Sequence, residues 1–157
     1  MVVIGLGSPF LTDDSVGPRV VRMLSKLDMP GVRLTESHAG GLLLLEELAD
    51  TQQAVIVDAL LDERRQPGEV LVADVGTATR NASCGHDCSL AEALSIGRAM
   101  GMKLPADDAI HLVAVVAQDV STFSEQLTWP VEAALAKACE TVRNLLDIQP
   151  LACREQP

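Results

Sequence analysis

Three side chains in this 157-residue sequence could bind a metal ion or move a proton. Asp14 follows a first apolar run, Asp58 closes a second one, and His86 lies in a polar loop. Two carboxylates and an imidazole form a mixed oxygen and nitrogen ligand set. A borderline divalent metal such as Zn²⁺ or Ni²⁺ accepts such a set and keeps positions open for water or substrate. Each residue also has an ordinary interpretation, because Asp14 would complement a helix dipole and His86 would be an exposed loop residue.

The stretch that carries Asp14 is expected to form a strand, a glycine turn and a helix. An apolar run, Met1 to Ile4, leads into the turn Gly5-Leu6-Gly7. Apolar residues then recur at helical spacing, and Thr12 or Asp13 is expected to cap that helix. The residues on its expected apolar face are Val16, Val20, Val21, Leu24 and Leu27.

The same glycine turn has a second interpretation, as a dinucleotide site. Gly-x-Gly after a strand can seat a pyrophosphate on the N-terminus of a helix. Here Phe10 stands where the third glycine of that fingerprint is expected, and two carboxylates lie where a phosphate would approach. These residues favour a cation, and a nucleotide-binding enzyme stays as the alternative on chemistry alone.

The rest of the chain alternates strands and helices. Strands are expected at 32–36, 54–58, 69–74 and 110–116, and helices at 42–48, 90–102 and 131–146. The segment between Asp58 and residue 69 is too short for a parallel crossover, so 69–74 is expected to be an antiparallel edge strand. Met100 is expected on the apolar face of the 90–102 helix.

This order of elements predicts an α/β fold. We expect a three-layer α/β/α sandwich of the phosphorylase/hydrolase-like type, with a mixed, mostly parallel five-stranded sheet. Residues 1–150 would form a single domain, and 151–157 a flexible C-terminal tail.

Such sheets bind ligands beyond the carboxyl ends of their parallel strands. Asp14, Asp58 and the loop around His86 are all expected at that edge. His38, in a turn after the second strand, would face the same crevice as an auxiliary ligand, a general base or a rim residue. Cys84 and Cys88 flank His86, but no second cysteine pair completes a zinc cage.

Composition narrows the class of protein. The formal charge of −10 and the pI near 4.6 argue against a nucleic-acid partner, because no basic patch is evident. No apolar run approaches the ~20 residues of a membrane span, and Met1 leads directly into a strand without a signal peptide. Four cysteines in such a chain are expected to stay reduced. We expect a cytoplasmic monomer.

Several motifs resemble those of the maturation endopeptidases of nickel-iron hydrogenases. Gly5-Leu6-Gly7-Ser8-Pro9 and Asp13-Asp14-Ser15-Val16-Gly17 match the N-terminal signature of that family closely. Ile56-Val57-Asp58-Ala59 resembles its apolar strand ending in an aspartate, and His86-Asp87 with Leu90 resembles its histidine loop. The motifs occur in the family's order over nearly the whole chain. The turn 37–41 and the cysteines beside His86 depart from the usual pattern.

The resemblance implies a hydrolase that clips a C-terminal extension from the hydrogenase large-subunit precursor after nickel insertion. The metal-binding positions of the family correspond to Asp14, Asp58 and His86. The nickel would be carried by the precursor, and zinc or cadmium would also occupy the site in vitro. The precursor and its C-terminal peptide are the expected partners, and nickel would be the recognition element.

Two mechanisms and one further function stay open at this point. The metal could polarise the scissile carbonyl or activate water, or Asp14 or Asp58 could act as a general base while the metal only positions the peptide. A serine or cysteine nucleophile with a partner base is not evident, which argues against an acyl-enzyme. A non-catalytic nickel-sensing chaperone of the large subunit is the alternative function.

Overall fold

A five-stranded mixed sheet forms the centre of the molecule in the computed structural model, which describes residues 1–38, 40–75 and 89–146. Its strands lie in the order β2-β1-β3-β5-β4, and only the edge strand β4 is antiparallel to its neighbour. The prediction of a mixed, mostly parallel sheet with an antiparallel edge strand is confirmed. The strands are β1 (Val2–Leu6), β2 (Arg33–Ser37), β3 (Ala54–Leu60), β4 (Val70–Asp74) and β5 (Ile110–Val116).

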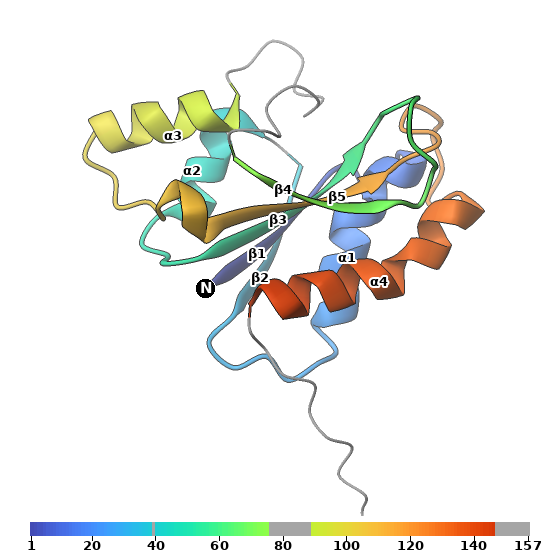
Figure 1. Ribbon diagram of the computed structural model, residues 1–157, viewed down its shortest axis with the longest axis horizontal. Coiled ribbons are helices and arrows are strands. Elements are labelled where there is room, and N and C mark those ends of the chain that lie inside the picture. The colour runs from blue at the N-terminus through green and yellow to red at the C-terminus, as the bar shows by residue number, and fades with distance from the viewer. Residues whose placement is uncertain (39, 76–88, 147–157) are drawn as a thin grey trace, which may run out of the picture.

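Helices cover both faces of this sheet and make the expected three layers. Helices α1 and α4 pack on one face, and α2 and α3 lie on the other (Figure 1). The α-helices are α1 (Val16–Leu24), α2 (Leu44–Leu48), α3 (Leu90–Ala99) and α4 (Trp129–Leu145). Short 3-10 turns precede two of them and β5, namely η1 (Thr12–Ser15), η2 (Gly41–Leu43) and η3 (Asp107–Ala109).

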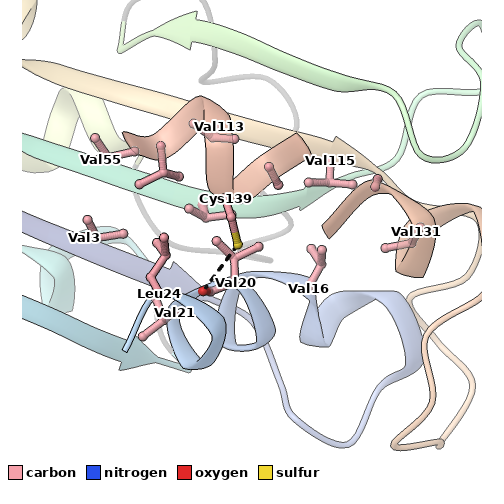
Figure 2. Packing of buried hydrophobic residues seen from close by; sticks show 14 of the residues in the cluster. Val3, Val16, Val20, Val21, Leu24, Val55, Val113, Val115, Val131 and Cys139 are labelled. Atoms are coloured by element: carbon pink, nitrogen blue, oxygen red, sulfur yellow. Dashed lines mark hydrogen bonds between the residues drawn. The ribbon is translucent and has the colours of Figure 1, made fainter. Parts of the chain in front are cut away.

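Two hydrophobic cores share the sheet because successive residues of a strand point to opposite faces. In β3, Val55 and Val57 pack toward α1 and α4, whereas Ala54 and Ile56 pack toward α2 and α3. Figure 2 shows the first of these cores, where valines from the strands meet α1 and the Cys139 thiol lies 3.9 Å from the carbonyl oxygen of Val20. Burial on both faces explains why β3 is a continuous apolar run.

The structure corrects three details of the sequence prediction. Helix α1 ends at Leu24, so Leu27 is exposed instead of packed. Helix α3 ends at Ala99, and Met100 is exposed at its C-terminus. The helix expected at 42–48 begins as the 3-10 turn η2 before it becomes α2. Helical periodicity identifies the apolar faces but does not locate the residue at which each helix ends.

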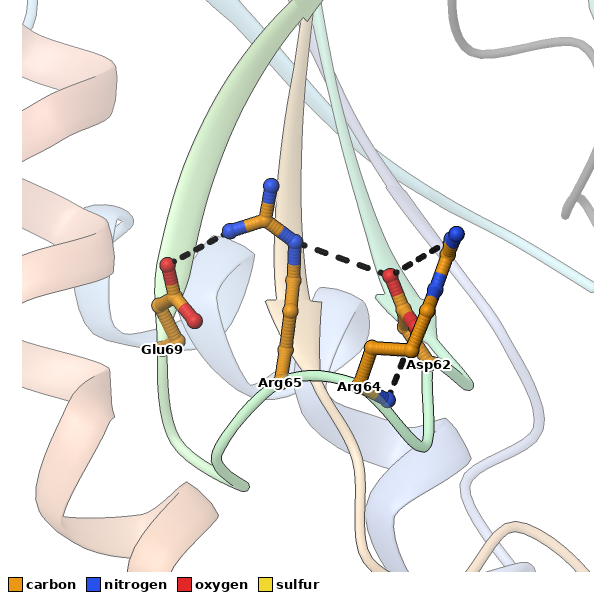
Figure 3. A network of polar contacts seen from close by, with 4 residues as sticks. All are labelled: Asp62, Arg64, Arg65 and Glu69. Atoms are coloured by element: carbon orange, nitrogen blue, oxygen red, sulfur yellow. Dashed lines mark hydrogen bonds and ion pairs between the residues drawn. The ribbon is translucent and has the colours of Figure 1, made fainter.

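The connection between β3 and β4 is held by an ion-pair network on the surface. Arg64 and Arg65 both contact the carboxylate of Asp62, and Arg65 also pairs with Glu69 at 2.7 Å (Figure 3). Exposed pairs of this kind contribute about 0–1 kcal/mol each, so their main effect is to order the turn that follows β3.

Among the described helices, none combines the length and the apolar character needed to cross a membrane.

Candidate functional site

The first helix approaches the sheet closely because two glycines face each other across the contact. A Cβ atom added to Gly17 would lie 2.2 Å from the carbonyl oxygen of Leu6 and 2.5 Å from that of Val57. One added to Gly5 would lie 2.3 Å from the carbonyl oxygen of Gly17. Only glycine fits at either position, so the N-terminal end of α1 sits directly over the carboxyl ends of β1 and β3.

Gly7 and Ser8 position Asp14 at the end of β1. Gly7 has a φ of +125°, and a Cβ added there would lie 1.8 Å from the carbonyl oxygen of Asp14. The backbone N–H of Ser8 donates a hydrogen bond of 2.6 Å to the Asp14 carboxylate. The Asp14 side chain is half-buried and so remains accessible from solvent. These contacts confirm the predicted position of Asp14 beyond the first strand.

Asp58 lies near the end of β3, close enough to Asp14 for the two carboxylates to interact. Burial raises the pKa of Asp58 to about 6, the hydrogen bond from the Ala59 N–H opposes that rise, and the negative charge of Asp14 adds to it. A carboxyl group with a pKa near neutrality can accept a proton during a reaction and release it again. The structure therefore brings together Asp14 and Asp58, as the sequence predicted.

His38 borders the same turn from the end of β2. Its Nδ1 lies 2.9 Å from the carbonyl oxygen of Gly7, and its side chain is exposed. A carbonyl oxygen only accepts hydrogen bonds, so Nδ1 is the donor, and in a neutral imidazole this leaves a lone pair on Nε2. That nitrogen is able to bind a metal or accept a proton, which agrees with the predicted placement of His38 at the rim.

His86, the third predicted ligand, lies outside the described residues, as do Cys84 and Cys88 and the predicted tail 151–157. In the part of the chain that the structure describes, no group of three or more His, Cys, Asp or Glu side chains is placed to hold a metal ion. Asp14 and Asp58 supply oxygen donors that fit a divalent cation, and a third ligand would have to come from elsewhere.

Asp13 has a role that the sequence interpretation missed. Its fully buried carboxylate accepts hydrogen bonds from the backbone N–H groups of Gln118, Asp119 and Thr128 and from the Thr128 hydroxyl, at 2.7–3.0 Å. Neither Asp13 nor Thr12 caps α1 with its side chain, which contradicts the predicted cap. Asp13 instead joins the β1–α1 turn to the start of α4. No local signal marks these partners, which lie 105–115 residues away.

The loop before α4 is ordered by a second aspartate. Hydrogen bonds from Thr122 and Ser121 hold the pKa of Asp119 well below its usual range. The backbone carbonyl of Asp119 also accepts a hydrogen bond of 2.9 Å from the backbone N–H of Asp13. The two loops that border Asp14 are thus fixed to each other by buried and partly buried polar contacts.

The glycine turn is occupied by protein backbone. The space beside Gly5, Gly7 and Gly17 is filled by neighbouring backbone atoms, and the N–H of Ser8 is already bonded to Asp14. A pyrophosphate site needs this space and such N–H groups for the ligand. The geometry therefore favours the close-packing interpretation of these glycines over nucleotide binding.

Comparison with known proteins supports one family. No family model matches the chain. The chain is 29% identical over 147 residues to the hydrogenase 2 maturation protease of Escherichia coli K12, covering 90% of this chain and 87% of that protein. Its fold is similar to the solved structure of the hydrogenase maturating endopeptidase HybD from Escherichia coli, with a TM-score of 0.79, 28% identity and coverage of 93% and 91%.

A solved archaeal structure shows the same fold at lower identity. The hydrogenase 2 maturation peptidase from Thaumarchaeota archaeon SCGC_AB-539-E09 has a TM-score of 0.70 and 24% identity, over 94% of this chain and 98% of that one. The order of the motifs, the identity over nearly the full length and the fold agree with one another. The chain is therefore similar, in sequence and in fold, to hydrogenase maturation endopeptidases.

Proposed function

We propose that this endopeptidase removes the C-terminal extension of a nickel-iron hydrogenase large-subunit precursor after nickel has been inserted. The observation that carries the proposal is the pair Asp14 and Asp58, close together at the carboxyl edge of the sheet in a chain related to hydrogenase maturation proteases. The nickel belongs to the precursor and is the feature that the enzyme recognises. Cleavage would then follow only when the metal is in place.

In this proposal the two carboxylates and His86 hold the nickel of the precursor. Carboxylate oxygens and an imidazole nitrogen suit Ni²⁺, and zinc or cadmium would bind the same set in vitro. Binding the metal would place the adjoining C-terminal peptide beside the carboxyl edge of the sheet. Either carboxylate could take a proton from an attacking water, and burial raises the pKa of Asp58 to about 6 in the metal-free protein. Asp14 is held in position by the Ser8 N–H.

The proposed partners of the enzyme are the large-subunit precursor and its C-terminal peptide. We also predict that the enzyme is a monomer and acts in the cytoplasm. His38, at the rim, is proposed as an auxiliary ligand or proton acceptor through Nε2.

The test is the intact mass of a nickel-iron hydrogenase large-subunit precursor from the same organism, incubated with the protein with and without nickel loading. We expect loss of the C-terminal peptide only with nickel and wild-type protein. Asp14→Ala and His86→Ala should abolish processing while the protein stays folded, with at most a small drop in melting temperature for Asp14→Ala. The matched control is Asp28→Ala, an exposed aspartate between α1 and β2, which should process normally. A nickel-loaded precursor that binds but keeps its mass would indicate a chaperone instead.

A further inference from the structure

The aromatic side chains of this protein are all on its surface. The chain has two phenylalanines, one tryptophan and no tyrosine. Phe10 is 50% exposed, Phe123 79% and Trp129 82%. Aromatic residues usually supply much of the buried area of a core, but here valine, leucine, isoleucine and alanine fill both cores. The aromatic residues therefore contribute nothing to the two cores.

Phe10 and Phe123 form a preorganised pair. Their rings stack with centroids 5.9 Å apart and an angle of 10° between the ring planes. Their two loops are tied by backbone hydrogen bonds, from Ser124 N–H to the Phe10 carbonyl and from Thr12 N–H to the Ser124 carbonyl, both 2.9 Å. The Thr12 hydroxyl adds a bond of 2.7 Å to the Thr122 carbonyl. The rings are thus held in place before any partner binds, which lowers the entropic cost of binding.

Trp129 belongs to the same end of the molecule. It is the first residue of α4 and directly follows Thr128, whose N–H and hydroxyl donate to Asp13. Figure 1 shows the β5–α4 loop and the start of α4 at the same end as the start of α1. We call Phe10, Phe123 and Trp129 the aromatic surface.

The aromatic surface is carried by the loops that border the candidate site. Phe10 lies in the same β1–α1 turn as Asp14, and Asp13 joins that turn to the segments that carry Phe123 and Trp129. A polypeptide bound at Asp14 would contact the turn that also carries Phe10. Met100 and Leu27 are also large and exposed, but they follow the C-terminal ends of α3 and α1. They therefore lie at the opposite, amino-terminal edge of the sheet.

We propose that the aromatic surface is the docking site for the hydrogenase large-subunit precursor, through an apolar patch of the precursor next to its cleavage site. This inference rests on the proposed function. Exposed, rigid aromatic residues are enriched at the centres of protein interfaces, where a few of them carry most of the binding energy. Such a surface lets the enzyme hold the folded precursor independently of the metal contact at Asp14 and Asp58.

The test compares steady-state cleavage and binding of the nickel-loaded precursor by wild type, Phe123→Ser, and the double variant Phe10→Ser/Phe123→Ser. For the double variant we expect KM and the Kd from surface plasmon resonance to rise about tenfold, with kcat within about twofold of wild type. Phe123→Ser alone should give a smaller rise of the same kind. Met100→Ser is the matched control, because Met100 is 76% exposed at the far edge, and it should leave both constants unchanged.

Wild-type KM and Kd in the folded double variant would overturn the docking surface while the proposed function stands. Binding without cleavage by wild type would overturn the proposed function, and the Kd values would still decide the docking surface. A precursor that neither binds nor is cleaved would overturn both. A wild-type dimer that the double variant loses in sedimentation would assign the surface to a second copy of this chain and overturn the docking proposal.

Discussion

Asp13 and Asp14 are adjacent in the sequence, but their carboxylates face different parts of the molecule. Asp13 is fully buried and accepts four hydrogen bonds from the β5–α4 region, whereas Asp14 is half-buried at the site and accepts one from Ser8. Asp13 therefore stabilises the loops around the candidate site, whereas Asp14 is part of the site itself. A variant of each should separate structural from functional effects.

Asp13→Ala should destabilise the fold by about 3–5 kcal/mol, because it leaves three backbone N–H groups and a hydroxyl without their acceptor. Asp14→Ala removes a single hydrogen bond and should cost about 1 kcal/mol. Urea unfolding followed by circular dichroism measures both free energies. Equal losses in the two variants would contradict the structural role assigned to Asp13.

Asp58 should lower the stability of the metal-free protein as the pH rises. Its pKa is about 6 in the folded protein, above the 3.8 that is ordinary for an aspartate, so the folded state holds the proton more tightly than the unfolded chain. That contribution is fully present below about pH 4 and is lost as the pH rises through about 6. Asp58→Asn removes the charge and can keep the hydrogen bond from Ala59. It should therefore stabilise the protein by about 1–3 kcal/mol at pH 8 and by almost nothing at pH 4.

The measurement for Asp58→Asn is urea unfolding at a series of pH values from 4 to 8, in the presence of a chelator. The same variant should lose precursor processing, because one of the two carboxylates of the proposed site is gone. A difference from wild type that does not change with pH would contradict the raised pKa of Asp58.

At the scale of elements, the contact between α1 and the sheet decides whether the site forms. Gly17 lets the helix lie against the ends of β1 and β3, and this contact sets the position of Asp14 relative to Asp58. The glycine-rich motif thus acts through packing, and the aspartates of the motif depend on it. Loss of this contact should affect stability and activity together.

Gly17→Ala should destabilise the protein by about 3 kcal/mol or more, because its Cβ would overlap the backbone oxygens of Leu6 and Val57. Gly97→Ala is the matched control in α3. Its Cβ would meet only the flexible ends of Leu104 and Leu45, and alanine improves helix propensity by about 1 kcal/mol. Thermal unfolding should therefore show a large loss for the first variant and little change for the second. A melting temperature for Gly17→Ala equal to that of wild type would show that α1 can shift.

At the scale of the whole molecule, one sheet joins two cores. In β1, Val3 packs toward α1 and α4, while its neighbour Ile4 packs toward α2 and α3. Neither layer of helices can separate from the sheet without exposing one complete face of these strands. We therefore expect the predicted single domain to unfold as a unit.

Leu24→Ala and Leu94→Ala test this coupling, since each removes a fully buried side chain from a different core. Each should cost about 2–5 kcal/mol and leave a single transition. Calorimetry identifies a single transition when the calorimetric enthalpy of unfolding equals the van't Hoff enthalpy. Two separate transitions in either variant would show that the layers unfold independently and would contradict the single domain.

The sequence by itself determined the order of elements and the place of the two carboxylates. Periodicity is local, so the alternation of strands and helices could be predicted residue by residue, and the short β3–β4 connection required an antiparallel edge strand. Asp14 and Asp58 could be placed at one edge because the carboxyl ends of parallel strands coincide. His86 stays a prediction from the sequence.

Only the tertiary structure decided which distant residues meet. Asp13 was expected to cap its own helix, but its partners are Gln118, Asp119 and Thr128 in another loop. The stacking of Phe10 on Phe123 is likewise a contact between residues far apart in the sequence. Buried hydrogen bonds and ring contacts depend on how the loops pack after the sheet has formed. Sequence spacing carries no information on such pairs, because they are set by the geometry of the assembled sheet and helices and not by local periodicity.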